Sequence, residues 1–266
     1  MNKPYFSIIT VTKNSQETIS KTLESVKSQT FEDYEHIVVD GFSVDNTFQI
    51  INNYESKKII KKQIIDNSCY EGLNNAIKFI RGRYIILLHS GDIFYSDQTL
   101  EKVKENINEN IDLVICNCIF FYEFNKIRRV WEIKKQIINV SNCYKVPHTS
   151  TIMSNKLVNR IGDYKLKYKI ASDTEYLLRI FQNKNINYII LNDHLCFMKL
   201  GGLSTNFKFL LKKIKEDLNI YLIFFGKRKF IYQYLKKILF KINQNFFLKN
   251  TYYYEKILLK LLKRES

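Results

Sequence analysis

The chain has 266 residues and a net charge of +16, enough length for one large domain or for one domain with an appendage. Its five cysteines are odd in number and scattered, which argues against a disulfide framework and for reduced thiols in a cytosolic protein. The amino-terminal apolar run is too short for a signal peptide. No stretch approaches the ~20 apolar residues of a membrane-spanning helix, so we expect a cytoplasmic protein.

The first half of the sequence alternates between strand and helix patterns. Nearly continuous apolar runs rich in β-branched residues predict four buried strands: Tyr5–Thr12, His36–Asp40, Lys58–Ile65 and Tyr84–Leu88. The apolar spacing between them predicts helices, one capped by Ser15, one at Phe48–Tyr54 and one at Gly72–Ile80. This alternation predicts an α/β fold with a Rossmann-like, mostly parallel central sheet flanked by helices.

Polar residues end three of these strands at the edge where ligands bind in such sheets. They are Thr12–Asn14, Asp40 and His89–Asp92. We therefore expect the functional site at the carboxyl ends of the strands.

The second half has a different pattern. It predicts a strand hairpin at 112–122 and 126–133 with Asn125 in its turn, a helix at Asn155–Ile161, a helix at Ala171–Phe181, two strands at 187–191 and 194–200, and the turn Gly201–Asn206. Ser172 and Glu175 have the spacing of a capping box at the start of the second helix.

The charge is concentrated at the carboxyl terminus. From Thr205 to Ser266, fifteen Lys or Arg stand against four Asp or Glu, which predicts a boundary near Gly201–Thr205 and a basic helical tail. Five apolar residues of the tail fall near one helical face: Ile231, Leu235, Ile238, Leu239 and Ile242. Such a helix can lie on an anionic membrane surface, or it can be an ordinary cap packed on the rest of the protein.

Five segments in order resemble family 2 glycosyltransferases of the GT-A fold. They are the stretch from Phe6 to Thr47, DNSCYEGLNNAIKFIRGRYIILLHSGD, PHTSTIMS, IGDYKLKYKIASDTEYLLRIF and GGLSTN. The resemblance is strongest to the bacterial branch that builds lipopolysaccharide O-antigen, capsule and colanic-acid-type polysaccharide. It implies a GT-A catalytic domain at 1–204, with a nucleotide-sugar-binding half at about 1–95 and an acceptor-side half at 96–204, followed by the tail at 205–266.

The implied reaction is an inverting hexosyl transfer from a nucleotide diphosphate sugar, UDP-linked, to a hydroxyl of a lipid-linked or oligosaccharide acceptor. An acid at the end of the second strand can accept a hydrogen bond from a nucleobase or a ribose. The resemblance assigns Asp40 to the nucleoside, although Asp-Gly is also a common turn pair. Thr12, Glu71 and Arg179 are further donor-side candidates. Glu71 can equally be a first-turn acid favoured by the helix dipole, and Arg179 a solvated helix residue.

For the departing diphosphate, the family uses a D-x-D-like motif after the fourth strand. His89–Asp92 (HSGD) keeps only the final acid. Because hard divalent cations take oxygen ligands and are usually completed by substrate phosphates, we expect Asp92 to bind Mg²⁺ or Mn²⁺. The alternative is a turn residue that ends a buried strand. Three interpretations of His89 stay open: a neutral spectator, a weak metal ligand, or a sign of altered donor choice.

The proton transfer needs a carboxylate near the anomeric carbon. The resemblance assigns the catalytic base to Asp173, which otherwise stabilises a helix amino terminus. His148 matches a family segment on the acceptor side, although a lone His is more often structural. The glycine turn at Gly201–Ser204 resembles a segment that approaches the active site, or is simply a tight turn.

Two other functions fit parts of the sequence. The basic tail can bind nucleic acid, but it carries no nucleic-acid motif, and acids cluster at the sheet edge where a phosphate-tracking groove would not want them. A GT-A-fold nucleotidyltransferase would need a glycine-rich loop after the first strand, and Thr10–Thr18 contains no glycine. We therefore expect no nucleic-acid partner, and a protein bound peripherally to the inner face of the cytoplasmic membrane through residues 205–266.

Overall fold

The computed structural model describes residues 3–108, 110–122, 127–201 and 209–246. Its strands are β1 Phe6–Thr12, β2 Tyr34–Asp40, β3 Ile59–Gln63, β4 Tyr84–Leu87, β5 Ile93–Phe94, β6 Leu113–Phe121, β7 Ile127–Trp131, β8 Thr151–Ser154 and β9 Tyr188–Lys199. Its helices are α1 Ile19–Lys27, α2 Thr47–Asn53, α3 Cys69–Ile77, α4 Thr99–Glu105, α5 Asn155–Ile161, α6 Ser172–Gln182 and α7 Leu210–Phe246, with the 3-10 helices η1 Cys143–Lys145 and η2 His148–Ser150. The predicted turn at Asn125, most of the turn after Gly201 and the end of the tail lie outside the described residues.

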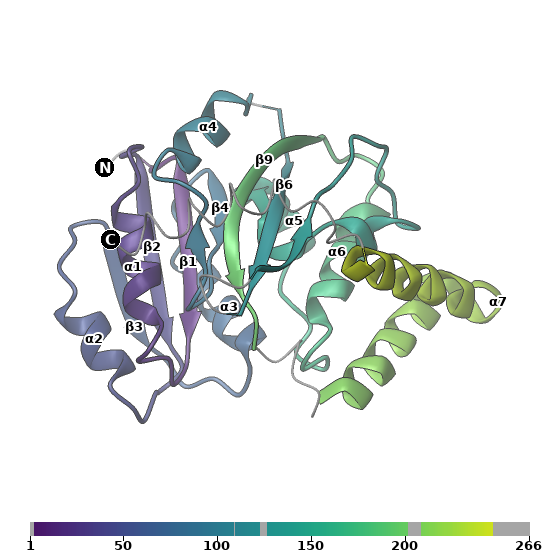
Figure 1. Ribbon diagram of the computed structural model, residues 1–266, viewed down its shortest axis with the longest axis horizontal. Coiled ribbons are helices and arrows are strands. Elements are labelled where there is room, and N and C mark those ends of the chain that lie inside the picture. The colour runs from purple at the N-terminus through teal and green to yellow at the C-terminus, as the bar shows by residue number, and fades with distance from the viewer. Residues whose placement is uncertain (1–2, 109, 123–126, 202–208, 247–266) are drawn as a thin grey trace.

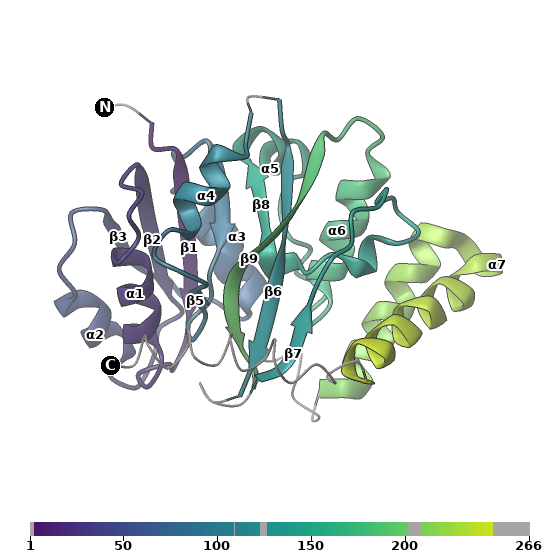
Figure 2. The same ribbon diagram turned by 45° about the horizontal axis from the view of Figure 1, so that its top comes forward.

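The strands form one mixed sheet in the order β3-β2-β1-β4-β8-β6-β9-β5, with β7 paired to β6. The strands β1 to β4 are parallel, as the alternation of strands and helices predicts. β8 then runs antiparallel to both β4 and β6, while β6 and β9 are parallel. Figures 1 and 2 show α1 and α2 beside β1–β3, with α6 and α7 toward the opposite end of the molecule.

Alternate residues of the buried strands face two separate cores. Ile9 and Val11 of β1 pack with α3, α5, α6 and α7. Phe6 and Ile8 of the same strand pack in a second core, with residues of α1 and α4. Helices therefore cover both faces of β1, which explains why its sequence is continuously apolar instead of alternating.

The two strands predicted at 187–191 and 194–200 are one strand, β9. Its register against β6 shifts on both sides of Asn117. At the shift, Asn117 Nδ2 donates to the Asn192 carbonyl at 2.8 Å, and Asn117 Oδ1 accepts from the backbone N–H of Ile133. The prediction was wrong because the polar residues Asn192 and Asp193, which looked like a turn, occupy an irregularity within a continuous strand.

Both predicted helix caps were also wrong. α1 begins at Ile19, and Ser15 contributes its carbonyl, not its hydroxyl, to the backbone N–H groups of Thr18 and Ile19. Ser172 is already the first residue of α6, and its hydroxyl donates to the Lys165 carbonyl at 3.0 Å. The backbone N–H groups before α6 are instead bound by a side chain of helix α7.

Helix α7 is part of the packed structure. A non-helical Gly226 (φ 69°) divides it into arms at 210–225 and 227–246, and Figure 2 shows the arms folded back beside each other. Glu216 in the first arm accepts hydrogen bonds from the backbone N–H groups of Lys169, Ile170 and Ala171 at 2.8–3.0 Å. These N–H groups lead directly into α6, so a carboxylate from α7 stabilises the start of that helix.

The first arm also buries Ile220 and Tyr221 in the core, which agrees with the alternative of a packed helical cap. Within the described ranges, no helix combines the length and the apolar composition that crossing a membrane requires.

His36 of β2 is buried between the sheet and its covering helices. Its Nε2 lies 2.9 Å from Thr10 Oγ1, which donates its own hydrogen to the Leu88 carbonyl at 2.7 Å. Thr10 Oγ1 must therefore accept the hydrogen of Nε2. Burial lowers the pKa of His36 to about 3, so the side chain is neutral in the folded protein at physiological pH.

This difference predicts a pH dependence of stability. His36 has a folded pKa far below its unfolded value, so between about pH 6.5 and 3 the unfolded chain binds more protons and stability falls as the pH falls. We expect His36 to account for up to about 1.4 kcal/mol of lost unfolding free energy per pH unit below 6. Urea unfolding from pH 7.5 to 5 should show a shallower loss in His36→Gln than in the wild type. Parallel slopes in the two proteins would contradict this role.

Candidate active site

The topology brings the candidate residues to one edge of the sheet. The register of β1 and β2 pairs Thr12 with Asp40 at the ends of both strands. β8 runs in the opposite direction to β4, so His148, which lies just before β8, returns to the edge where β4 ends and His89 follows it. His148 and Asp173 line one cavity at this edge, and the charge of Asp173 acts on the pKa values of both His148 and His89.

Asp40 is completely buried and holds a turn. Its Oδ2 accepts from the Ser43 backbone N–H at 2.9 Å and from Gln63 Nε2 at 3.0 Å, and its Oδ1 accepts a short hydrogen bond from the Ser43 hydroxyl. Both oxygens are therefore engaged in the loop after β2. These contacts favour the turn alternative for Asp40 over direct contact with a nucleoside.

Asp66, which the sequence reasoning missed, lies at the same edge. It follows β3 and lies against two glycines: a Cβ added at Gly41 would stand 2.6 Å from its carboxylate, and one added at Gly72 would stand 2.9 Å away. Lys13 Nζ lies 3.7 Å from Asp66 Oδ1. Burial raises the pKa of Asp66, partly against the charge of Lys13. The rule that ligands bind beyond strand ends would have identified Asp66, had it been applied to the third strand.

Thr12, a further donor-side candidate, has a side-chain hydroxyl without a hydrogen-bond partner among the described residues. This Oγ1 is also buried. A buried hydroxyl without a partner is uncommon in folded proteins and calls for an explanation. A bound ligand at this edge would supply the missing partner.

Glu71 and Arg179 make structural contacts instead. Glu71 accepts from the Asn67 backbone N–H at 2.8 Å and from its side chain at 3.1 Å, and the backbone bond is the main cause of its lowered pKa. Ser68 caps the same helix, so Glu71 acts within the cap of α3. Arg179 pairs with Glu175 at 2.9 Å and donates to the carbonyls of Ile161 and Asp163. These contacts favour structural roles for both residues.

The two carboxylate oxygens of Asp92 have different surroundings. Oδ1 accepts from the Lys199 backbone N–H at 2.9 Å, while Oδ2 is buried and has no partner among the described residues. Burial raises the pKa of Asp92 to about 7. The preceding Gly91 has φ 94°, and a Cβ added there would stand 3.1 Å from the Lys199 side chain, so the loop needs a glycine.

His89 lies beside this acid and is neutral. Burial, together with the charge of His148, lowers the pKa of His89 to about 4, and its Nδ1 is buried without a partner in the regions the structure describes. An unprotonated ring nitrogen is compatible with either a ligand or a hydrogen-bond acceptor.

Asp173 and His148 form the other part of the site. His148 Nε2 lies 3.0 Å from the Tyr164 hydroxyl, and burial lowers the pKa of His148. Burial alone would raise the pKa of Asp173, but the nearby charges of His148, Lys213, Lys237 and Lys241 outweigh it and the pKa is lowered. Asp173 is therefore ionised at neutral pH.

The donor set can be tested against a divalent cation. Among residues that the structure describes, no group of three or more His, Cys, Asp or Glu side chains could hold a metal ion. The chain fits a cation through the unpartnered Asp92 Oδ2, provided that the substrate completes the coordination. Mg²⁺ in particular is commonly held by one or two carboxylates together with substrate phosphates.

Comparison with known families identifies the chain. The model of the glycosyl transferase family 2 matches residues 7–173, which include β1, β2, β4, Asp92 and the start of α6. The chain belongs to this family. It is a glycosyltransferase, so the two other functions that fit parts of the sequence are no longer favoured.

Curated relatives of this glycosyltransferase come from bacteria. It is 27% identical over 188 residues to a PGL/p-HBAD biosynthesis glycosyltransferase of Mycobacterium bovis, covering 69% of this chain and 72% of the relative. It is also 26% identical over 209 residues to a poly(ribitol-phosphate) beta-glucosyltransferase of Bacillus spizizenii, covering 64% of this chain but only 33% of the relative.

Solved structures establish the GT-A fold of this glycosyltransferase. It superposes on residues 1–349 of S. aureus TarS in complex with UDP-GlcNAc with a TM-score of 0.63 and 20% identity, over 98% of this chain and 72% of that TarS chain. A mannosyltransferase from Pyrobaculum calidifontis, in complex with GDP-Man and Mn²⁺, gives a TM-score of 0.59 and 14% identity. The superposition covers 99% of this chain and 74% of the mannosyltransferase chain.

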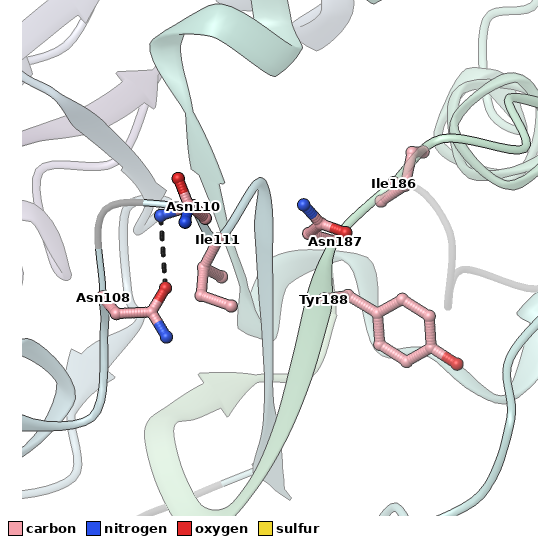
Figure 3. A pocket seen from close by; sticks show the side chains of 6 residues that line it. All are labelled: Asn108, Asn110, Ile111, Ile186, Asn187 and Tyr188. Carbon is pink, nitrogen blue, oxygen red and sulfur yellow. Dashed lines mark hydrogen bonds between the residues drawn. The ribbon is translucent and has the colours of Figure 1, made fainter.

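Two of the cavities formed by the described residues lie at different edges of the glycosyltransferase. One of about 280 Å³ is lined by Asp173 and His148, together with residues of α7 and β7. Another, of about 370 Å³, is lined by three asparagines, two isoleucines and Tyr188 near the amino-terminal ends of β6 and β9 (Figure 3). The second cavity has no carboxylate or histidine in its lining, and the acid-base residues converge at the edge of the first.

Proposed function

We propose that the enzyme transfers a sugar, with inversion, from a nucleotide diphosphate sugar to an acceptor hydroxyl in bacterial surface polysaccharide synthesis. The observation that carries the proposal is the pair of carboxylates at one edge: Asp92, with a buried unpartnered oxygen, and Asp173, held ionised beside His148. The proposal places the donor-binding half at about 1–95, the acceptor side at 96–204 and the tail at 205–266.

The donor is proposed to be UDP-linked and to bind over the ends of β1 to β3. Thr12 Oγ1 and the carboxylate of Asp66 are the polar groups there that best fit a nucleoside, while Asp40 holds the loop that carries them. The support from similar proteins is their bound donors, UDP-GlcNAc in TarS and GDP-Man in the Pyrobaculum enzyme.

Asp92 Oδ2 is proposed to hold Mg²⁺ or Mn²⁺. Such a cation neutralises charge on a departing diphosphate when it is bound. The chain's part is to keep Oδ2 fixed, through the bond of Oδ1 to Lys199, and to keep the site dry. His89 supplies a neutral ring beside it.

Asp173 is proposed as the general base. As the acceptor oxygen forms its bond to the anomeric carbon and the bond to the donor phosphate breaks, the hydroxyl proton passes to the carboxylate of Asp173. The cations that lower the pKa of Asp173 keep it unprotonated before the reaction. A positioned base of this kind contributes roughly 10²–10⁴-fold in rate.

Asp173→Asn should therefore lower sugar transfer by roughly 10²-fold or more. Its thermal midpoint should fall only modestly, through the lost attraction to the nearby cations, because among the described residues the carboxylate accepts a hydrogen bond from the Thr174 N–H alone. Release of nucleoside diphosphate from a panel of UDP-, GDP- and dTDP-sugars measures both the donor and the effect. Asp163→Asn, at an exposed acid ahead of the same helix, is the matched control. A large loss of stability with retained activity would instead support a purely helix-stabilising Asp173.

Asp92→Asn tests the cation. It removes the charge that binds Mn²⁺ but keeps the shape, so we expect Mn²⁺ to strengthen UDP binding in the wild type and to have no effect in the variant. Isothermal titration with UDP, with Mn²⁺ or with EDTA, measures this. His89→Asn is the comparison: preserved Mn²⁺ dependence identifies His89 as a spectator. Full activity of Asp92→Asn, or of the wild type in EDTA, would refute the metal role.

The acceptor is proposed to be a lipid-linked or oligosaccharide chain at the cytoplasmic membrane surface. The second arm of α7 leaves four apolar residues 45–59% exposed along one side: Ile231, Leu235, Leu239 and Ile242. Lys227, Arg228 and Lys229 are exposed at the start of the same arm. Ile238, predicted on the same face, packs instead against the core. An apolar stripe with basic residues beside it fits the interface of an anionic membrane.

Flotation with liposomes that contain phosphatidylglycerol tests this stripe. The wild type should float with anionic but not with neutral liposomes, and Leu235→Glu/Leu239→Glu should remain at the bottom because it removes apolar burial and adds repulsion. Val44→Glu changes an even more exposed apolar residue elsewhere and should still float. Equal flotation of all three proteins would exclude the stripe.

A further inference from the structure

The cavity beside Asp173 has a lining that the proposed reaction does not use. Its walls come from β6, β7, β9, η1, η2, α6 and both arms of α7. Every lining residue falls between Phe120 and Lys241, so none belongs to the donor-side half of the chain. Asp173 and His148 are the residues it shares with the acid-base site. A molecule in this cavity would therefore reach Asp173 from the acceptor side.

Four cationic side chains line the cavity: Arg129, Lys213, Lys237 and Lys241. They come from β7 and from both arms of α7, which are distant in sequence. Such a gathering of like charges is unfavourable unless anions balance it.

The carboxylates present do not balance these cations. Asp217 pairs with Lys237 at 2.7 Å, and Thr174 Oγ1 lies 3.1 Å from the same ammonium. Asp173 is the one carboxylate in the lining. With Asp217 and Asp173 ionised and His148 neutral, an excess of two positive charges therefore remains when Lys241 is protonated.

Two of the cations have unused donors. Within the described ranges, neither the guanidinium of Arg129 nor the ammonium of Lys241 makes a hydrogen bond or an ion pair. Arg129 is held in place by stacking, with its guanidinium carbon 4.1 Å from the centre of the Phe120 ring and 4.7 Å from that of Trp131. Burial, with the charges of Lys237 and Lys213, lowers the pKa of Lys241 to about 7. An ordered guanidinium and a poorly solvated ammonium are suited to an anion.

We propose that this cavity binds a phosphate group of the acceptor and thereby places the acceptor hydroxyl at Asp173. A phosphate carries enough charge and enough oxygens to meet cations from several elements at once. The cavity of about 280 Å³ is near the lower end of small-molecule sites, roughly 300 Å³, so it admits a phosphate with little more than one neighbouring unit. Assignment of the phosphate to the acceptor rests on the proposed transferase function.

The single tryptophan of the chain, Trp131, lines the cavity and makes binding measurable. Glycerol 3-phosphate and inorganic phosphate, titrated into the full chain at constant ionic strength, should each give a saturable change in its fluorescence. Lys241→Met should weaken the affinity at least tenfold. Its melting temperature should not fall, because the substitution removes a half-buried, poorly solvated charge that has no ion-pair partner among the described residues. Lys212→Met, at the exposed residue next to Lys213, should bind as the wild type does.

Several results would overturn the proposal. One is an absence of saturation with both probes, and another is an unchanged phosphate affinity in Lys241→Met. A third is an equal loss of affinity in Lys212→Met, because that result would indicate general attraction to a basic surface. Displacement of glycerol 3-phosphate by UDP would assign the cavity to the donor and would also overturn it. Failure of UDP to bind, with phosphate binding intact, would count against the proposed transferase reaction while leaving the phosphate site in place.

The source of the phosphate is decided by a parallel titration. A polyprenyl phosphate in detergent micelles, compared with empty micelles, should bind more tightly than glycerol 3-phosphate if the acceptor is lipid-linked. Equal affinities would assign the phosphate to a soluble or polymeric ester. Both results support the cavity as a phosphate site. If empty micelles gave the same fluorescence change as polyprenyl phosphate and neither soluble phosphate gave any, the change would report detergent binding and would contradict the phosphate site.

Discussion

The hydrogen bond between Asp92 and the backbone of Lys199 connects distant parts of the chain at the sheet edge where the candidate residues gather. It joins the loop after β4 to the end of β9, across 107 positions of sequence. The bond fixes one carboxylate oxygen and leaves the other buried without a partner. In the proposed role of metal ligand, a carboxylate held in this way needs no further ordering when the substrate binds, so binding energy is not spent on positioning it.

Helix α7 imposes the second constraint. Glu216 holds the N–H groups that lead into α6, and Lys237 reaches Thr174 in the first turn of that helix. The position of Asp173 therefore depends on a helix that the sequence presents as a basic appendage. The inner side of α7 packs against the rest of the enzyme, as the packed-cap alternative expects, and its outer side carries the exposed apolar stripe, whose binding to a membrane stays a proposal.

The sequence predicted the sheet edge well and the contacts at that edge poorly. Buried parallel strands have a strong local signal, because continuous apolar runs end where the backbone leaves the core. This locates Thr12, Asp40 and Asp92 without knowledge of neighbours. By contrast, the side-chain partners of Asp40 and Glu71, the cap of α6 by Glu216 and the return of α7 at Gly226 depend on tertiary contacts, which local propensity does not encode. Asp66 was missed although its signal, an acid after a strand, was available.

The surroundings of Asp92 and Asp173 shift the pKa values of the two carboxylates in opposite directions. Asp92 is buried, so desolvation raises its pKa to about 7 and favours a ligand that supplies positive charge. Asp173 is also desolvated, but the cations of α7 and the ring of His148 lower its pKa. Carboxyl groups separated in this way can take different roles at one pH. The cations that keep Asp173 ionised also face the cavity beside it. A phosphate bound there would offset their charge and raise the basicity of Asp173 when the acceptor is in place.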